Sequence, residues 1–291
     1  MSEWWTGLWE AFEQPHLQRA LWLCLLAGFS NGFVSGIVVL RKSALMVSSL
    51  SHSLLPGIAI GVLVAGLSPW SAFVGAAVAG LIVGLGSVLV ARGARLGQET
   101  VLAVFYSAAF AAGILLLSYA PGAVQIEQYL FGNVLFASDD DLRVVFWVCA
   151  VTVVTLAALQ RPLLVMLFEP AAAQSAGVPV RSLQYVLLGA VILVLISSLQ
   201  AVGCILAVGL LVTPGACVAL WVTSPAALLW GGALVGSVGA AVALVAAHHW
   251  DWGPGSAIVL VMSGLFLLSW LVGKRHGVLP RWWRGRKAFD N

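Results

Sequence analysis

One ionisable side chain within a long apolar segment carries the clearest chemistry in this sequence. His52 lies about eight residues into a hydrophobic stretch over residues 44–65. Neutral imidazole is a common metal ligand near pH 7, and an ionisable group inside a membrane-spanning segment usually faces a cavity or a partner. His52 is therefore a candidate ion ligand, and a hydrogen bond from the imidazole to a neighbouring helix carbonyl is the alternative.

The residues around His52 add a second polar group and a break in the helix. Ser48 precedes His52 by one helical turn, so both side chains lie on the same face. Pro56, followed by Gly57, cannot donate a backbone hydrogen bond and crowds the carbonyl of residue 52, which predicts a kink there. Broken helices at mid-membrane depth recur at the substrate sites of transporters.

The composition shows which elements must position these residues. The chain has 291 residues, of which 61% are hydrophobic and 9% are charged. A soluble domain carries about a quarter charged residues, so a soluble protein is excluded. The apolar runs reach the roughly 20 residues that a membrane-spanning helix needs and are apolar on nearly every face, which excludes a β-barrel. An all-α polytopic transmembrane bundle is predicted.

The apolar runs predict eight or nine spans in a single permease-like domain over residues 17–273. The nine candidates are 17–40, 44–65, 70–91, 100–119, 142–160, 182–200, 203–222, 226–247 and 255–273. A segment over 1–16 precedes them outside the cytoplasm, and a basic cytoplasmic tail over 274–291 follows.

The basic residues predict the orientation, because Lys and Arg in short loops are retained on the cytoplasmic side. Successive loops lie on alternate faces of the membrane, and the loops of one face contain Arg41, Lys42, Arg92, Arg95, Arg161, Arg181, Lys274, Arg275, Arg281, Arg284, Arg286 and Lys287. This pattern places the N-terminus outside and the C-terminus in the cytoplasm of a multi-pass protein of the bacterial plasma membrane.

Two connections and two small-residue faces add detail. An apolar outer connection over 121–141 is expected to contain a short helix that dips against the bundle. An inner connection over 168–180 predicts a short helix along the cytoplasmic surface, with proline early and glycine near its end. Small residues four apart, which let helices approach closely, occur at Gly28, Gly32 and Gly36 and at Gly232, Gly236 and Ala240.

A group of acidic and histidine residues is expected near the outer mouth. It comprises Glu127, Asp139, Asp140, Asp141, His248, His249 and Asp251. Such a group would concentrate a dication by electrostatic attraction. The alternatives are a solvated rim and, for the three consecutive aspartates, capping of the fifth span's N-terminus.

Motifs in the same order and spacing across about 40–270 resemble the zinc/manganese ABC-transporter permeases. They are Leu40-Arg41-Lys42 through Ser51-His52-Ser53-Leu54-Leu55-Pro56-Gly57, Tyr129-Leu130-Phe131-Gly132-Asn133, Phe168-Glu169-Pro170 with Ala176-Gly177-Val178-Pro179-Val180, Leu199-Gln200-Ala201-Val202-Gly203 and Leu210-Leu211-Val212-Thr213-Pro214. The resemblance implies an importer of two permease copies, two cytoplasmic ATPase subunits and an extracytoplasmic metal-binding protein, with membrane lipid around it, no nucleic acid and no permanently bound cofactor.

The resemblance also assigns roles to particular residues. The family's cytoplasmic coupling helix corresponds to 168–180, so Phe168, Glu169, Pro170 and Gly177 are expected to dock the ATPase. In the second span the family pairs its histidine with an aspartate one turn earlier. His52 matches that histidine, whereas Ser48 stands at the aspartate position.

The serine bears on the identity of the cargo. A hydroxyl is a weak neutral ligand, so the carboxylate that offsets a dication's charge is missing. A second His52 from the dimer partner, other groups or looser hydrated coordination would have to replace it. Imidazole kept without the hard carboxylate favours zinc over manganese. Manganese, iron or a metal chelate such as haem are the alternative cargoes.

Two other function classes fit the sequence less well. No HExxH or GxSxG motif of an enzyme is present, and the nearest approach to a phosphate-binding loop has Arg41 at the second glycine position. ATP hydrolysis is therefore expected on a separate subunit. A stand-alone secondary carrier would normally have charged residues in several spans, whereas His52 is nearly alone here.

Overall fold

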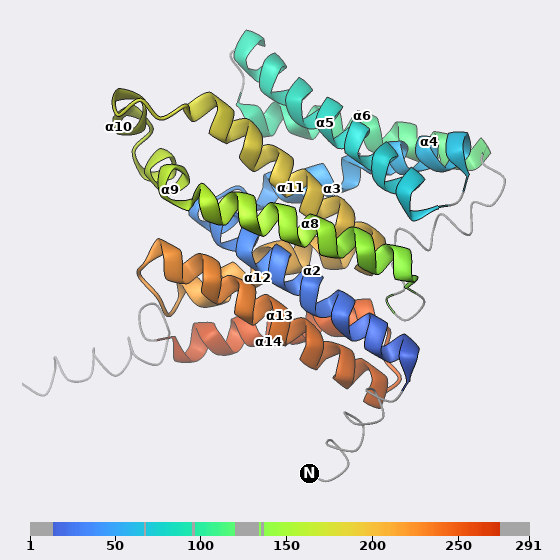
Figure 1. The fold of residues 1–291 in the computed structure, drawn as a ribbon. Helices are drawn as coiled ribbons and strands as arrows, with labels where there is room; N and C mark the ends of the chain where they lie inside the picture. The colour runs from blue at the N-terminus through green and yellow to red at the C-terminus, as the bar shows by residue number, and fades with distance from the viewer. Residues whose placement is uncertain (1–13, 67, 95–96, 120–133, 135–136, 274–291) are drawn as a thin grey trace, which may run out of the picture.

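The computed structural model describes residues 14–66, 68–94, 97–119, 134 and 137–273. These residues form a bundle of helices without a strand (Figure 1). The helices are α2 (Pro15–Leu40), α3 (Ala44–Ser53), α4 (Leu55–Ala65), α5 (Pro69–Ala94), α6 (Gln98–Tyr119), α8 (Asp139–Ala158), α9 (Gln160–Phe168), α10 (Pro170–Ser175), α11 (Val180–Val202), α12 (Cys204–Ala219), α13 (Pro225–His249) and α14 (Pro254–Val272). The predicted helix in the outer connection over 121–141 falls almost entirely outside them.

Among the described residues, eight helices or helix pairs are long and apolar enough to span a membrane. α3 and α4 together make the second of these spans. The predicted span over 203–222 is different, because α12 has only 16 residues. At 1.5 Å per residue it covers roughly 24 Å, less than a hydrocarbon core of about 30 Å. The described residues thus contain eight full-length spans, in line with the predicted eight or nine, and the ninth candidate is a shorter helix that follows the break at Gly203, whose φ of 94° is left-handed.

The α2–α13 pair forms the most closely packed crossing of the bundle. A Cβ placed on Gly28 would overlap the carbonyl of Gly236, and one placed on Gly32 would overlap the carbonyl of Gly232. The same overlap occurs from the α13 side. The two predicted small-residue faces therefore meet each other within one chain, and the backbones touch because neither face carries side chains at these positions.

A second glycine crossing joins α4 to α5. Gly57 approaches the backbone of Gly75 and Gly61 approaches that of Ser71 so closely that a Cβ on either glycine would overlap a carbonyl oxygen. α4 starts immediately after the interruption at Leu54, with Pro56 in its first turn. The predicted kink is thus a break between two helices.

Buried polar side chains tie α2 to α11 and α12. Asn31 donates hydrogen bonds to the Ala27 carbonyl and to the hydroxyl of Ser198 on α11. The Ser35 hydroxyl donates to the Val212 carbonyl and accepts from the Gly215 N–H, on either side of Pro214 within α12. The two Ser35 bonds satisfy backbone groups next to Pro214, where a helix in lipid would otherwise leave such groups unpaired.

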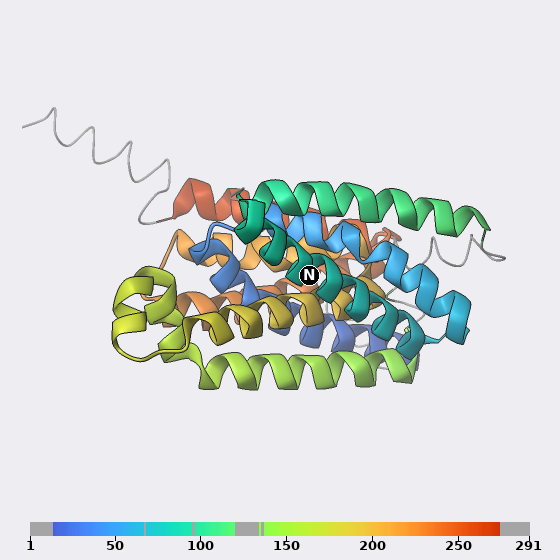
Figure 2. The ribbon, with the colours of Figure 1, turned by 90° about the horizontal axis from the view of Figure 1, so that it is seen from above.

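The bundle has two distinct ends. α9 and α10 project from one end, which we call the coupling end; Figure 2 shows the same projection from above. Five of the eight exposed tryptophans in the described residues lie toward the two ends: Trp70 at the start of α5 and Trp250 and Trp252 in the α13–α14 turn at the opposite end, and Trp221 after α12 and Trp270 late in α14 at the coupling end. This arrangement is typical of aromatic belts at membrane interfaces.

Candidate functional site

The break between α3 and α4 determines where His52 lies. α3 starts at the coupling end and finishes one residue after His52. The Leu54 N–H bonds to the Ser51 carbonyl at 3.4 Å, a tightened last turn, and the Ile58 N–H bonds back to Leu54 at 3.1 Å as α4 begins. From Ala44, eight residues at 1.5 Å place His52 roughly 12 Å into the span. The imidazole is therefore in the apolar zone beside an interrupted backbone.

The His52 ring packs against two aromatic rings of α6. Its centroid is 6.0 Å from that of Tyr106 and 5.8 Å from that of Phe110, the latter in an edge-to-face arrangement. His52 and both aromatic residues are half-buried. The aromatic wall limits the directions in which the imidazole can point.

Sequence reasoning missed Tyr106 and Phe110. Their spacing of four residues puts them on one face of α6, which is a recognisable signal. The sequence does not show that this face meets α3, because the pairing of α3 with α6 depends on the fold. Gly113, one turn further along α6, packs against Pro56, so the same helix supports both the histidine and the break.

Ser48 and His52 share a partly open face of α3. Both side chains are half-buried, as is Ser49, whose hydroxyl donates to the Leu45 carbonyl. Leu45 is 76% exposed. Ser48 and His52 thus lie one helical turn apart on a face of α3 that the described chain covers only in part, since Tyr106 and Phe110 of α6 pack against His52.

The three consecutive aspartates have structural partners at the end opposite the coupling end. Asp141 and Ser138 form a reciprocal capping box at the start of α8. Asp139 makes an ion pair with Arg19 at 2.7 Å, and Asp140 pairs with Arg143 at 3.0 Å. The capping interpretation thus applies to Asp141, and the other two carboxylates are partly neutralised by arginines.

The remaining outer-mouth candidates lie at the same end of the bundle. His248 and His249 finish α13 and are exposed, and Asp251 occupies the following turn with a φ of 52°. Glu127 lies outside the described residues. Across the described ranges, no three His, Cys, Asp or Glu side chains are grouped closely enough to hold a metal ion. The structure brings these residues to one end without gathering them into one cluster.

The short helix predicted in the connection over 168–180 is present as α10 (Pro170–Ser175). Glu169 lies between α9 and α10, Pro170 is the first residue of α10, and Gly177 follows it with a φ of 78°. The Val178 N–H bonds back to Ala173 at 2.9 Å and closes the turn. Ala173 is the only buried residue of α10, and Phe168 is 58% exposed. This element is therefore free to contact another protein.

The sequence of this bundle matches a family model for the ABC 3 transport family over residues 13–273. The match covers the whole helical domain, including the break, the short α12 and the protruding α10. The chain belongs to this family, whose members are membrane subunits of ABC transporters. The resemblance drawn from the motifs is confirmed.

Individual relatives agree with this assignment. The chain is 35% identical over 274 residues to the manganese transport system membrane protein MntC of Halalkalibacterium halodurans, covering 94% of this chain and 92% of the relative. It is 29% identical to the chelated iron transport system membrane protein YfeC of Yersinia pestis, covering 95% and 93%. Its fold is similar to a chain of PsaBC from Streptococcus pneumoniae, with a TM-score of 0.84, 28% identity and coverage of 94% and 97%.

Proposed function

We propose that this chain is the permease of an importer that carries a divalent transition-metal ion into the cytoplasm by alternating access. The observation that carries the proposal is the half-buried His52, held by aromatic rings beside a helix break inside a membrane span. In this role His52 contacts the ion in transit. Pro56 lacks the N–H that would bond to the carbonyl of residue 52, so we expect that carbonyl to offer an oxygen ligand beside the imidazole where no carboxylate is present.

A second copy of the chain completes the pathway. The α3 face that carries Ser48 and His52 continues into the exposed Leu45, and α6 beside it has only 17% of its span buried within the chain. Two such faces opposed across a dimer axis would bring two imidazoles to one ion. This arrangement supplies the second His52 that compensates for the serine.

The distribution of charge supports an orientation with the coupling end in the cytoplasm. Arg41, Lys42, Arg161 and Arg181 lie at that end, whereas Asp139–Asp141 lie at the opposite one. Basic residues are retained on the cytoplasmic side. The N-terminus is then outside, and His248, His249, Asp251 and the aspartates surround the entrance to which an extracytoplasmic metal-binding protein delivers the ion.

The coupling element receives the mechanical input. Phe168, Glu169, Pro170 and Gly177 form an exposed projection next to the start of α11. A cytoplasmic ATPase subunit bound to each copy would push on this projection when it hydrolyses ATP. α11 leads from there to the Ser198–Asn31 contact with α2, so the movement reaches the core of the bundle through a continuous helix.

Manganese or ferrous iron is the cargo that we favour, in place of the zinc suggested by Ser48 alone. The relatives described above are named for manganese and chelated iron. Manganese and iron accept oxygen and imidazole ligands together, which the break and a pair of His52 side chains would provide. Zinc is tested alongside these two ions, because the missing carboxylate weakens the site for every dication.

The principal test replaces His52 by alanine in the assembled transporter reconstituted into vesicles. We expect metal uptake to fall at least tenfold, because loss of one charge-assisted or metal–ligand contact is worth more than about 1.4 kcal/mol. Uptake of Mn²⁺, Fe²⁺ and Zn²⁺ is measured separately. His16→Ala, which removes an exposed histidine at the start of α2, is the matched control. Unchanged uptake in H52A would contradict a role for His52 in the pathway.

A second test separates coupling from ion binding. Phe168→Ala removes an exposed ring from the projection, and we expect metal-stimulated ATP hydrolysis to fall severalfold while metal retention by the permease is unchanged. Val165→Ala, another exposed apolar residue on α9, is the control for the loss of apolar surface. Equal ATPase rates in both variants and the wild type would remove Phe168 from the coupling surface.

A further inference from the structure

A cavity at the coupling end is separate from the face that carries His52. Its volume is about 330 Å³, and it opens between the ends of α2 and α5 and the starts of α3, α6 and α11. Met46, which lines it, precedes His52 by six residues and so points to a different side of α3, since successive helical residues turn by about 100°. The cavity is thus not part of the face on which Ser48 and His52 lie.

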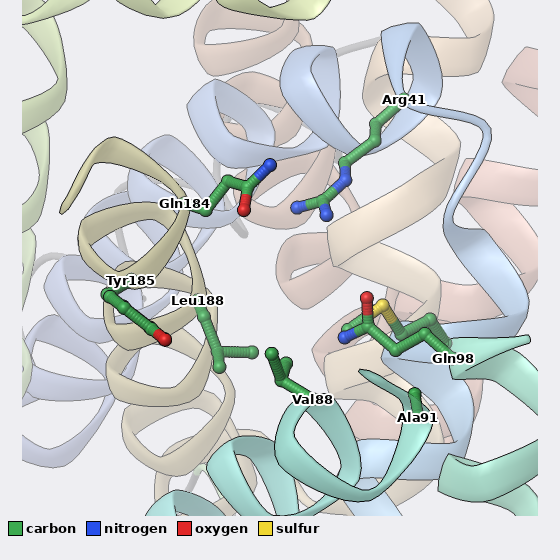
Figure 3. Close-up of a pocket in the computed structure, with 8 residues that line it drawn as sticks. Arg41, Val88, Ala91, Gln98, Gln184, Tyr185 and Leu188 are labelled. Atoms are coloured by element: carbon green, nitrogen blue, oxygen red, sulfur yellow. The ribbon is translucent and has the colours of Figure 1, made fainter. Parts of the chain in front are cut away.

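The polar groups of this cavity are dominated by hydrogen-bond donors. Figure 3 shows Arg41 and Gln184 pointing toward each other across it, with the Gln98 amide on a third side and Tyr185 at its rim. None of the eight lining residues is acidic or a histidine. A dication would be repelled by the guanidinium and would find no strong ligand there.

Arg41 is the one basic residue among those that line this cavity. Within the described part of the chain its guanidinium makes neither an ion pair nor a hydrogen bond, although the side chain is half-buried. Burial lowers the pKa of Arg41 from its ordinary value, because desolvation penalises the charged form. A partly buried arginine stays charged, so this cavity holds an uncompensated positive charge.

The rest of the lining is apolar. Val88 and Leu188 face each other below the polar groups in Figure 3, with Ala91 beside them. A narrower apolar crevice shares Arg41, Met46 and Leu188 with the cavity and continues between α3 and α11 toward Leu50 and Val191. The site therefore joins a cationic donor group at the membrane surface to an apolar wall that leads inward.

We propose that this cavity binds a phosphate group, with Arg41 as its counter-ion and Gln98, Gln184 and Tyr185 as additional hydrogen-bond donors. Guanidinium and phosphate match in charge and in bidentate geometry. The group can belong to an inner-leaflet phospholipid or to a soluble phosphate compound. This inference uses the proposed orientation only to name the inner leaflet, and it does not depend on metal transport.

The test measures thermal unfolding of the purified full-length chain in detergent. One series adds phosphatidylglycerol, a second adds diacylglycerol with the same acyl chains, and a third adds inorganic phosphate. We expect phosphatidylglycerol to raise the unfolding midpoint and diacylglycerol not to. Stabilisation by inorganic phosphate without a larger effect of phosphatidylglycerol assigns the site to soluble phosphate compounds. No stabilisation by either phosphate-bearing ligand overturns the proposal.

Variants place the effect at the cavity. Arg41→Gln is expected to weaken the apparent affinity about tenfold or more, since a charge-assisted hydrogen bond contributes more than one decade of binding. Lys42→Gln removes the same charge from the exposed neighbouring residue and serves as the matched control. Equal losses in R41Q and K42Q would overturn the assignment, because they would indicate general surface charge.

A variant on the opposite wall guards against a folding defect in R41Q. Gln184→Leu keeps the arginine and the size of the side chain while removing the facing amide. It is expected to weaken affinity severalfold. If R41Q does not fold, unchanged affinity in Q184L would count against the site. The failure of this proposal would leave the H52A result unaffected, since uptake and phosphate binding are measured separately.

Discussion

Two glycine crossings in this bundle have the same local geometry and opposite surroundings. α2 and α13 meet at Gly28, Gly32, Gly232 and Gly236, and α2 is buried over 72% of its span. α4 and α5 also meet backbone to backbone, but α5 is buried over only 28% of its span. The first pair forms the centre of the chain, whereas the second lies at its margin.

The two crossings differ in the continuity of the helices that form them. α2 and α13 are continuous helices of 26 and 25 residues. α4 has 11 residues and follows directly from the break beside His52. Glycine packing therefore stabilises the fold in the first case, and in the second it fixes a half-helix to its neighbour so that the break stays in place. One sequence pattern thus serves two purposes, depending on the continuity of the helices that carry it.

The largest effect is expected from Gly32→Ala. The added Cβ would overlap the Gly232 carbonyl, and two packed backbones cannot yield as a side chain can. We expect the unfolding midpoint in detergent to fall by roughly 5–10 °C, from an overpacking cost of about 1–3 kcal/mol. Gly264→Ala, where a Cβ meets nothing within 4 Å, is the control. A midpoint equal to that of G264A would show that the crossing is looser than described.

A smaller loss of stability is expected from Gly75→Ala, together with a loss of function. Its Cβ would overlap the Gly57 carbonyl, one residue after Pro56. We expect the midpoint to fall by less than in G32A, because α5 is buried over only 28% of its span, while metal uptake falls severalfold as α4 is displaced. Gly93→Ala, in the open part of the same helix, is the comparison. If G75A lost stability and metal uptake in the same ratio as G32A does, the two crossings would have the same structural role.

The smallest effect is expected where helix ends, and not helix faces, are stabilised. Ser138→Ala removes the hydroxyl that accepts from the Asp141 N–H and donates to the Asp141 carboxylate at the start of α8, while the bond from the backbone N–H of residue 138 remains. Loss of a capping residue costs about 1 kcal/mol, so a decrease of roughly 2–4 °C in the midpoint is expected. Ser107→Ala removes an exposed serine that bonds within α6 and should change little. A loss in S138A as large as that in G32A would contradict this ranking.

Much of the fold could be predicted from the sequence because lipid imposes a simple rule of length and polarity. The spans end within a few residues of their predicted limits, as for 226–247 and α13. The predicted start at 203 coincides with the break at Gly203, but hydrophobicity alone does not reveal that the helix after it ends at Ala219 and is too short for a full crossing. The backbone interruption at Leu54 lies two residues before Pro56, and proline removes a hydrogen bond wherever it lies within a helix.

The candidate site was less accessible to the same reasoning. His52 and Ser48 could be placed on one face by their spacing, but Tyr106 and Phe110 come from a helix whose position depends on the tertiary fold. The aspartates at 139–141 were read as either an ion-attracting group or a helix cap. The reciprocal Ser138–Asp141 bonds and the Arg19–Asp139 ion pair depend on side-chain geometry that one-dimensional spacing cannot give.

The tryptophans at the two ends make the bilayer itself part of the structure. Trp70, Trp250 and Trp252 mark one interface, and Trp221 and Trp270 mark the other. When lipid chains are shorter or longer than this spacing, helices accommodate the mismatch by tilting. α2 and α13 are continuous helices packed backbone to backbone, whereas the second span is interrupted at Leu54. A change in membrane thickness would therefore act on a continuous helix pair in one part of the bundle and on the interrupted span that holds His52 in the other.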